Sequence, residues 1–302
     1  MHDIIIVGGG PAGLTAAIYG LRAGKSVLVI EKAGFGGQIA FSPKVENIPG
    51  TASISGSEFA DKLTEQAMNL GADVELECVT EVIPGEVFTV RTEEGGQYLG
   101  KTVILSVGVK HRTLGLSGEE DLIGNGISFC AVCDGAFYTG QDVVMIGGGN
   151  SAMQEALLLS EVCRKVTIVQ NLPFFTGEKK LAEALESKEN VEIHFSTLVD
   201  GYLTEGGSLT GVRVKDEAGK TWEISADGVF LAVGLQPENA AFAEIAQLDD
   251  RGYFDTDEFC LTKTPGLFVA GDCRRKQIRQ VTTAAADGAV AAMAACRYLD
   301  TL

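Results

Sequence analysis

Residues 4–13 read Ile-Ile-Ile-Val-Gly-Gly-Gly-Pro-Ala-Gly, four branched apolar residues that lead directly into three glycines. The pattern predicts a buried parallel strand over residues 4–7, then a tight turn, then a helix over residues 14–23. The uncharged run from residue 4 to residue 21 is long enough to imitate a membrane span. Four glycines and a proline lie in its middle, so a strand, a turn and a helix explain it better.

The turn has the G-x-G-x-x-G spacing of a dinucleotide-binding unit of the Rossmann type. Gly8 permits the tight turn, Gly10 lets the backbone approach a pyrophosphate, and Gly13 allows the helix to pack closely. The pyrophosphate would then lie at the helix N-terminus. A second predicted strand, residues 26–30, ends at Glu31, whose carboxylate is placed to accept hydrogen bonds from a ribose.

The same arrangement recurs later in the chain. Residues 142–146 predict a strand, residues 147–152 read Gly-Gly-Gly-Asn-Ser-Ala, and residues 156–162 continue a helix towards a strand over residues 165–169. Two such units in one chain are far more specific than one. The residues of this second, weaker nucleotide site are Gly147, Gly149 and Ala152.

The C-terminal part of the chain indicates that one unit interrupts the other. Residues 266–272 read as another buried strand with an acid at its end, yet no glycine turn begins a unit there, so this strand must complete a sheet that starts elsewhere. We place the crossovers near residues 110–113 and 236–239. The predicted fold is α/β, with two Rossmann-like three-layer domains: residues 1–112 with 239–302, and an inserted domain of residues 113–238.

Composition narrows the class of protein. The chain has 302 residues, 45% of them hydrophobic, which suffices for two buried cores. Its net charge of −17 argues against nucleic acid, because phosphate binding needs clustered Lys and Arg. Seven cysteines without a small-domain framework do not suit a secreted disulfide scaffold, and the N-terminus has no basic signal region. We expect a cytoplasmic protein with small-molecule or protein partners and no membrane association.

Cys130-Ala131-Val132-Cys133, followed by Asp134, lies just before the second unit. A C-x-x-C pair is either a redox pair or half of a zinc site. A structural zinc site needs four ligands, and the sequence contains no second C-x-x-C and no C-x-x-H. A redox pair is therefore favoured, because nucleotide-type units would supply electrons and this spacing lowers thiol pKa values. We expect no metal.

The chain resembles the low-molecular-weight thioredoxin reductases from end to end. The central cysteine motif is highly specific to that family, and the flanking motifs follow in order along the chain. The motifs that carry the resemblance are residues 8–13, Gly36-Gly37-Gln38, residues 45–50 (Val-Glu-Asn-Ile-Pro-Gly), residues 130–135, Gly271-Asp272, and Arg279-Gln280-Val281 leading into residues 282–285.

The resemblance implies FAD as the cofactor and thioredoxin as the partner. It implies that Cys133 faces the flavin, that Cys130 attacks the disulfide of thioredoxin, and that Asp134 is the acid/base that handles the thiolate proton. It also implies a homodimer and a rotation of the inserted domain. The implied FAD contacts are Gly8, Gly10, Pro11, Ala12, Gly13, Glu31, Gly37, Gln38, Asn47, Gly271, Asp272, Arg279, Gln280 and Val281.

The helix that starts at Val281 would direct its positive end at the flavin. Two of these positions have simpler interpretations. Glu46-Asn47 could be a solvated turn, and Asp272 could be a helix N-cap. The five remaining cysteines read as small structural hydrophobes, although Cys273, beside Arg274, could have a lowered thiol pKa.

The sequence departs from the family at residues 170–176, Gln-Asn-Leu-Pro-Phe-Phe-Thr. Members that use NADPH carry His-Arg-Arg and a further Arg here, which grip the 2′-phosphate. Each lost charge-assisted bond should cost about 1.5–3 kcal/mol of binding free energy. Gln170 also lacks the negative charge that favours NADH. We predict a donor other than NADPH, although NADPH held weakly by Lys179 and Lys180 stays open.

NADH and ferredoxin are the candidate donors. Ferredoxins are generally acidic, so ferredoxin would need a basic landing site, and Arg274-Arg275-Lys276 with Arg279 is the dense cationic run. The same run could be an ordinary solvated loop. Two other functions stay open: reduction of another protein or small-molecule disulfide, and a flavin-bearing redox sensor or electron-transfer protein that turns over poorly.

Overall fold

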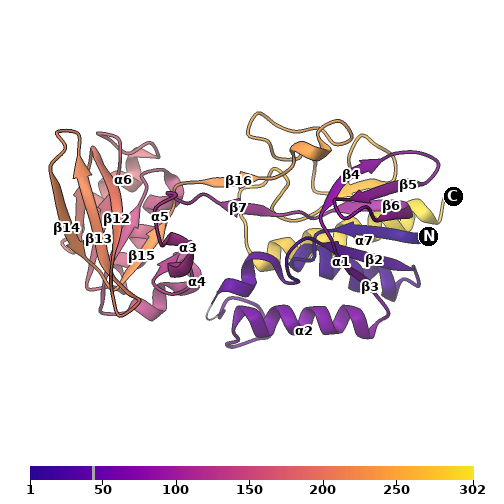
Figure 1. The fold of residues 1–302 in the computed structure, drawn as a ribbon, viewed down its shortest axis with the longest axis horizontal. Coiled ribbons are helices and arrows are strands. Elements are labelled where there is room, and N and C mark those ends of the chain that lie inside the picture. Colours follow the sequence, from indigo (N-terminus) through magenta and orange to yellow (C-terminus); the bar gives the residue numbers. More distant parts are fainter. Residues whose placement is uncertain (43–44) are drawn as a thin grey trace. The chain divides into compact units, whose positions relative to one another are not determined.

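The computed structural model describes residues 1–42 and 45–302, and the chain divides into two compact units. The first unit contains both ends of the chain, drawn in indigo and yellow in Figure 1. The segment Phe41–Asn47 clusters with the second unit, whereas the predicted boundary places it in the first domain. The units are Met1–Ala40 with Ile48–Lys110 and Gln236–Leu302, and Phe41–Asn47 with His111–Leu235.

One mainly parallel sheet organises the first unit. Its strand order is β3-β2-β1-β6-β5-β4, and β17 pairs in parallel with β6, so the C-terminal strand completes a sheet that begins near the N-terminus, as predicted. β4 and β5 extend the sheet in antiparallel fashion. The strands are β1 His2–Val7, β2 Val27–Glu31, β3 Asp73–Leu76, β4 Val79–Ile83, β5 Phe88–Thr92, β6 Gln97–Leu105 and β17 Leu267–Val269.

Alternation along β1 explains the layers of this unit, because successive side chains of a strand point to opposite faces. Ile4 and Ile6 pack on the side of α1 (Pro11–Arg22), α2 (Gly56–Asn69) and α7 (Val281–Leu299). Ile5 and Val7 pack with residues of β4 and β5 and with Phe242 and Phe254. The short 3-10 helices are η1 (Gly37–Phe41) and η3 (Ala240–Phe242).

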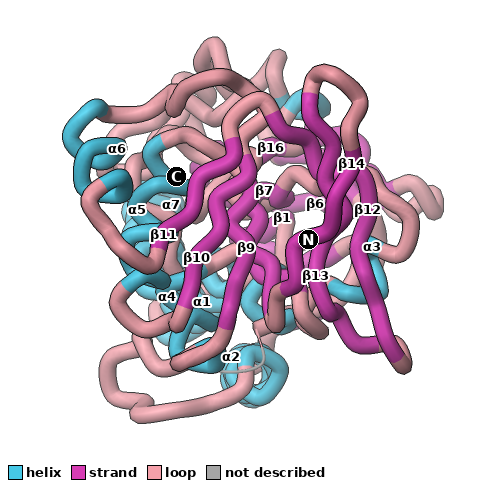
Figure 2. The backbone as a smooth tube through the Cα atoms, turned by 90° about the vertical axis from the view of Figure 1, so that its left-hand side faces the viewer, coloured by secondary structure: helices cyan, strands magenta, loops and turns pink. Residues whose placement is uncertain are grey.

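A fully parallel sheet, β11-β10-β9-β15-β8, forms the centre of the second unit. Figure 2 shows its strands side by side, with α5 and α6 on one side and the antiparallel sheet β12-β13-β14 on the other. Both predicted strands, residues 142–146 and 165–169, coincide with β9 and β10. The elements are α3 Glu119–Leu122, β8 Ile127–Ser128, α4 Ala131–Asp134, η2 Gly135–Tyr138, β9 Asp142–Ile146, α5 Asn150–Ser160, β10 Lys165–Val169, α6 Lys179–Glu186, β11 Val191–His194, β12 Thr197–Glu205, β13 Ser208–Asp216, β14 Thr221–Ser225 and β15 Gly228–Leu231.

The prediction of two Rossmann-like α/β layers is therefore confirmed for the fold of each unit. The chain passes between the units through β7 (Val109–His111) and β16 (Leu235–Pro237), which pair as a two-stranded sheet. Both strands overlap the predicted crossovers. Among the described residues, no helix has the length and apolar character that a membrane span requires.

Candidate functional site

Three of the four glycines in the first turn have different reasons to lack a side chain. Gly8 has φ +106°, and a Cβ there would lie 2.4 Å from the Ser106 carbonyl oxygen. A Cβ on Gly13 would lie 1.9 Å from the Gly8 carbonyl oxygen, so this glycine lets α1 approach β1. A Cβ on Gly10 would meet no described atom closer than Gly37 Cα, at 3.9 Å. The backbone at Gly10 thus stays open to a ligand.

Glu31 ends β2 beside this turn, at the carboxyl edge of the sheet where ligands of such folds bind. Its Oε2 accepts the N–H of Gly9 at 2.7 Å and its Oε1 accepts the N–H of Ala33 at 2.9 Å. The carboxylate is held by the backbone, and because a carboxylate has about four acceptor sites it can still receive ribose hydroxyls.

Two further predicted contacts lie on η1. Gly37 has φ +62° and lies against Gly10, since a Cβ on Gly37 would be 3.2 Å from Gly10 Cα. Gln38 is exposed on the same turn. Asn47 is exposed and belongs to the segment that clusters with the second unit.

Helices α1 and α7 and the Gly271 loop meet at Ala12, which follows Pro11 in the first turn of α1. A Cβ on Gly271 would lie 2.8 Å from Ala12 Cβ, and a Cβ on Gly288 would lie 2.1 Å from the Ala12 carbonyl oxygen. Gly271 has φ +84° and leads into Asp272. Residues more than 250 positions apart in the sequence, Ala12 and Gly271, are thus in contact.

Asp272 has an unmet hydrogen-bonding need. Its Oδ1 is buried and makes no hydrogen bond with the described residues, and it lies 3.6 Å from Lys276 Nζ, too far for a hydrogen bond. Burial raises its pKa, while Lys276 and Arg279 oppose that shift. A buried acceptor without a donor suits a ligand hydroxyl, such as those of a ribityl chain. Asp272 is not a helix N-cap, because the N-cap of α7 is Gln280.

The N-terminus of α7 follows the predicted motif. Gln280 and Thr283 form a capping box, and the helix starts at Val281 and runs for 19 residues. Arg279 donates to the Asp272 carbonyl oxygen at 3.3 Å, and its guanidinium lies 4.3 Å from the centroid of the Tyr253 ring. Arg279 is therefore fixed by contacts within the first unit.

The basic run beside Asp272 is mostly internal. Asp287 of α7 accepts two hydrogen bonds from Arg274, both at 2.7 Å, one from Lys276 Nζ at 2.9 Å and one from the N–H of Gly271 at 3.1 Å. The three side chains are 8–11% exposed. Arg275, which is exposed, pairs with Asp255. Neither the solvated-loop interpretation nor a free cationic landing site describes Arg274 and Lys276, since Asp287 pairs with both of them.

Cys273 is a structural residue, as expected, and the alternative of a lowered thiol pKa is wrong. Cys273 is fully buried, and burial raises the pKa of its thiol to about 12. Cys163, Cys260 and Cys296 are buried as well, while Cys78 is half-exposed.

Cys130 and Cys133 form a disulfide, with their Cα atoms 5.3 Å apart. Cys130 is the N-cap of α4, and its Sγ accepts the N–H of Cys133 at 3.2 Å. Asp134 is buried at the other end of α4, and Ser128 Oγ donates to its Oδ2 at 2.6 Å. The Ser128 hydroxyl oxygen also accepts the N–H of Cys130 at 3.1 Å. A hydrogen-bond chain thus joins Asp134 to the backbone of the redox pair.

Asp134 is poised to hold a proton. Its Oδ1 is buried with no hydrogen-bond partner in the described part of the chain, and burial raises its pKa although Ser128 opposes the shift. A carboxyl group with a raised pKa and a vacant acceptor beside a disulfide can act as an acid or a base.

Sequence reasoning missed a second carboxyl group, that of Glu155 on α5. Its Oε2 accepts the N–H of Ala131 at 3.1 Å, and burial raises its pKa to about 7. The sequence signal was the helical spacing: Glu155 lies three residues after Ala152 and four before Leu159, and both are buried. An acid in the buried stripe of a helix is a candidate for function.

The second glycine turn repeats the geometry of the first. Gly147 has φ +132°, and a Cβ there would lie 2.5 Å from the Ala232 carbonyl oxygen. Gly149 is the N-cap of α5, and Ala152 is buried in its first turn. A Cβ on Gly149 would meet no described atom closer than Thr176 Oγ1, at 3.8 Å.

Residues 170–178 fold over this second turn. The Gln170 side chain is buried against Gly148, where a Cβ would lie 2.4 Å from it, and its Nε2 donates to the Phe174 carbonyl oxygen at 3.1 Å. The N–H of Thr176 donates to the Gly148 carbonyl oxygen at 2.8 Å. The second glycine turn is therefore bordered by the neutral side chains of Gln170 and Thr176.

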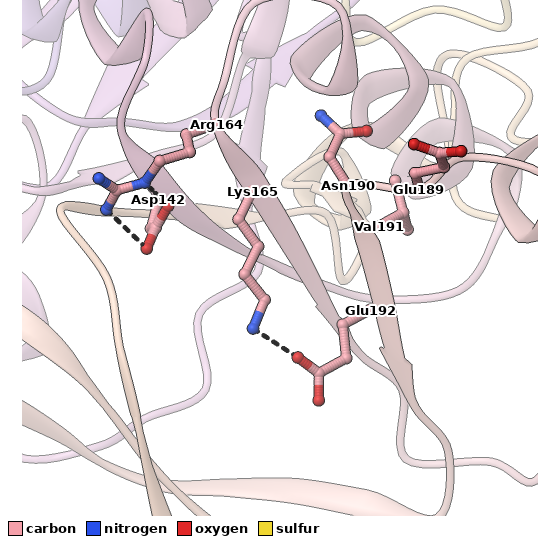
Figure 3. Close-up of a pocket in the computed structure, with 7 residues that line it drawn as sticks. All are labelled: Asp142, Arg164, Lys165, Glu189, Asn190, Val191 and Glu192. Atoms are coloured by element: carbon pink, nitrogen blue, oxygen red, sulfur yellow. Dashed lines mark hydrogen bonds and ion pairs between the residues drawn. The ribbon is translucent and has the colours of Figure 1, made fainter.

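Figure 3 shows a surface pocket of the second unit at the amino ends of β9, β10 and β11. Arg164 pairs there with Asp142 at 2.8 and 2.9 Å, and Lys165 pairs with Glu192. The glycine turn lies at the opposite, carboxyl ends of these strands, which is where α/β folds bind ligands. We assign no cofactor to this pocket.

Comparison with known proteins gives one consistent family. Residues 2–288 match the family model "Pyridine nucleotide-disulphide oxidoreductase". The chain is 39% identical to a thioredoxin reductase of Listeria monocytogenes, with 100% of this chain and 95% of the relative covered, and 40% identical to one of Treponema pallidum, with 100% and 98% covered. The crystal structure of thioredoxin reductase from Streptococcus pyogenes superposes with a TM-score of 0.92 at 36% identity, covering 100% of this chain and 99% of that one.

These matches span the whole chain and include the glycine turns and the disulfide described above. The chain belongs to the low-molecular-weight thioredoxin reductases, within the pyridine nucleotide-disulphide oxidoreductase family.

Proposed function

We propose that this protein is an FAD-dependent thioredoxin reductase that uses a donor other than NADPH. The observation that carries the proposal is the Cys130–Cys133 disulfide, joined through Ser128 to the buried carboxyl group of Asp134. The relatives from Listeria and Treponema are named thioredoxin reductases, which supports thioredoxin as the partner.

FAD, when bound, would supply two electrons to the disulfide. The open backbone at Gly10 and the start of α1 would hold its pyrophosphate, and Glu31 its ribose. Asp272 Oδ1, which makes no hydrogen bond with the described residues and lies 3.6 Å from Lys276 Nζ, would accept a ribityl hydroxyl. The N-terminus of α7 would favour negative charge on the reduced ring. The remaining proposed contacts are Gly37, Gln38, Asn47, Gly271, Arg279, Gln280 and Val281.

Reduction of the disulfide takes two electrons and two protons, and breaks the bond between Cys130 and Cys133. Cys133 receives the electrons in this proposal, and Asp134 supplies or removes the proton of its thiol. The Cys130 thiolate then attacks the disulfide of thioredoxin, so that a mixed disulfide forms and one thioredoxin thiolate leaves. Attack by the Cys133 thiolate on the Cys130 sulfur releases the second thioredoxin thiolate and restores the disulfide.

The segment over the second glycine turn supports a donor other than NADPH. A 2′-phosphate carries two negative charges at neutral pH, and residues 170–176 offer it no cation. Lys179 pairs with Glu183, and the N–H of Glu178 donates to Asn150 Oδ1 at 2.7 Å, which brings a further acid to this edge. NADH and reduced ferredoxin are the candidate donors, and a ferredoxin would have to dock elsewhere than on Arg274 and Lys276.

The test is an anaerobic titration of the purified protein with NADPH, NADH and reduced ferredoxin in parallel, followed by the visible absorbance of the flavin. We expect NADPH to bleach the flavin poorly at stoichiometric concentration, and one of the other donors to bleach it with about one two-electron equivalent. Cys130→Ser and Cys133→Ser should each abolish thioredoxin reduction and leave the flavin bound. Bleaching by stoichiometric NADPH contradicts the donor assignment, and a colourless protein contradicts the whole function.

A further inference from the structure

Glu155 is a half-buried acid that the proposed reaction does not use. It projects from α5 towards the start of α4, where its Oε2 accepts the N–H of Ala131 at 3.1 Å. Ala131 is the residue directly after Cys130 and is itself buried. The carboxyl group therefore contacts the first turn of the helix that carries the disulfide.

The redox helix thus has a carboxyl group at each end. Asp134 lies at its C-terminal end and is linked to the N–H of Cys130 through Ser128, while Glu155 binds the next N–H directly. Cys130 Sγ already accepts the N–H of Cys133 at 3.2 Å in the disulfide form. In the dithiol form the same N–H would stabilise a Cys130 thiolate, because hydrogen bonds to an anion favour its formation.

A negative charge on Glu155 acts in the opposite direction, because a nearby like charge disfavours the thiolate. We propose that Glu155 is a positioning residue for Cys130: its carboxyl group fixes the first turn of α4 through Ala131, and its protonation sets how readily the Cys130 thiol ionises. The inference deepens the proposed function, since it concerns the thiol that attacks the partner disulfide.

Burial is the main influence on the protonation of Glu155. Burial raises its pKa to about 7 and the N–H of Ala131 lowers it, and no charged side chain of the described chain contributes to the shift. The ionisable groups on the elements that pack against α5 are Cys130, Cys133 and Asp134 of α4, Tyr138 of η2, Asp142 of β9, Lys165 of β10, and Lys179, Lys180, Glu183 and Glu186 of α6.

The experiment measures alkylation of Cys130 by iodoacetamide in the dithiothreitol-reduced protein between pH 5.5 and 9.5, with the Cys130 peptide quantified by mass spectrometry. The wild type should show two inflections, one from Glu155 and one from the thiol. Glu155→Gln, which still accepts the N–H of Ala131, should show a single inflection. Its rate between pH 7 and 8 should be about three- to tenfold higher, since one pKa unit corresponds to tenfold in thiolate.

Glu161→Gln is the matched control, because Glu161 caps the same helix at its exposed end and pairs with Lys188. It should keep the wild-type profile. A single inflection in the wild type, or superimposable profiles of wild type and Glu155→Gln, overturns the proposal, and the wild-type profile decides even if the variant does not fold. The assay needs neither donor nor thioredoxin, so its failure is distinct from failure of the proposed function.

Discussion

His111, at the end of β7, shows how burial alone can set the protonation of a side chain. Its ring stacks on Phe129 with centroids 4.5 Å apart, and burial lowers its pKa from 6.5 to about 4. Phe129 directly precedes Cys130 in the sequence. The imidazole is therefore neutral at physiological pH and works as an aromatic surface beside the redox segment.

Acid should destabilise the protein through His111. Because the folded pKa is depressed, the unfolded chain binds the proton first, and stability is lost as pH falls from 6.5 towards 4. We expect the free energy of unfolding to fall by about 2 kcal/mol between pH 8 and pH 5 from this group. Urea unfolding at both pH values measures it. His111→Phe should reduce the loss, whereas His194→Gln, at a histidine of β11 next to Glu192, should not.

At the scale of elements, Asp287 fastens the Gly271 loop to α7. One carboxylate holds the guanidinium of Arg274, the ammonium of Lys276 and a backbone N–H, all nearly removed from water. Buried ion pairs of this kind contribute little net stability when complete but are costly when one partner is lost. Asp287 is therefore the side chain by which α7 holds the loop that carries Asp272, while Asn239 holds the same loop by donating to the Cys273 carbonyl oxygen at 2.8 Å.

Asp287→Asn should destabilise the first unit by about 3–5 kcal/mol, because Arg274 would lose its buried counter-charge and Lys276 would keep only its longer contact with Asp272. The purified variant should also retain less FAD. Denaturant unfolding and the ratio of flavin to protein absorbance measure the two effects. Asp300→Asn breaks an exposed ion pair with Lys25 at the end of the same helix and should leave the stability nearly unchanged. Equal effects of the two substitutions would disprove the special role of Asp287.

The sequence predicts some elements of this fold and misses others. The strand-turn-helix units were predictable because apolar runs lead directly into glycine turns, and β9 and β10 have the predicted bounds. The strand after Gly266 was predictable because it lacked a partner of its own. The antiparallel sheet β12-β13-β14 was missed, because its strands mix exposed and buried positions. Gly206-Gly207, at φ +60° and +87° between β12 and β13, was the hairpin signal that could have found it.

The sequence pattern could not predict which side chains pair when they lie far apart in the chain. The run at residues 274–276 reads as solvated, and only the fold brings Asp287 onto it. Glu155 stood in a buried helical stripe, yet its contact with Ala131 depends on the packing of α5 against α4. The sequence indicated Asp134 only because this residue follows Cys133. Its buried Oδ1, which has no hydrogen-bond partner among the described residues, could not be predicted, because it depends on the packing around α4.

At the scale of the whole molecule, each unit has its own cores. In the second unit, one face of the β9 sheet packs against α5 and the other against β13, and both interfaces are built from residues of that unit. The chain enters and leaves this unit through β7 and β16, which are hydrogen-bonded to each other. Its two ends are therefore held together, as in domains that tolerate excision.

We expect residues 109–237 to fold when produced alone. The fragment should unfold in one cooperative urea transition and form the Cys130–Cys133 disulfide, because the cores on both faces of the sheet and the β7–β16 pair are all retained. It should be colourless, since the glycine turn at residues 8–13 and Asp272 are absent. Val144→Asp, which buries a charge in the sheet, should abolish the transition and serves as the unfolded control. A fragment without a transition would show that the second unit depends on the first, and a yellow fragment would refute the assignment of FAD.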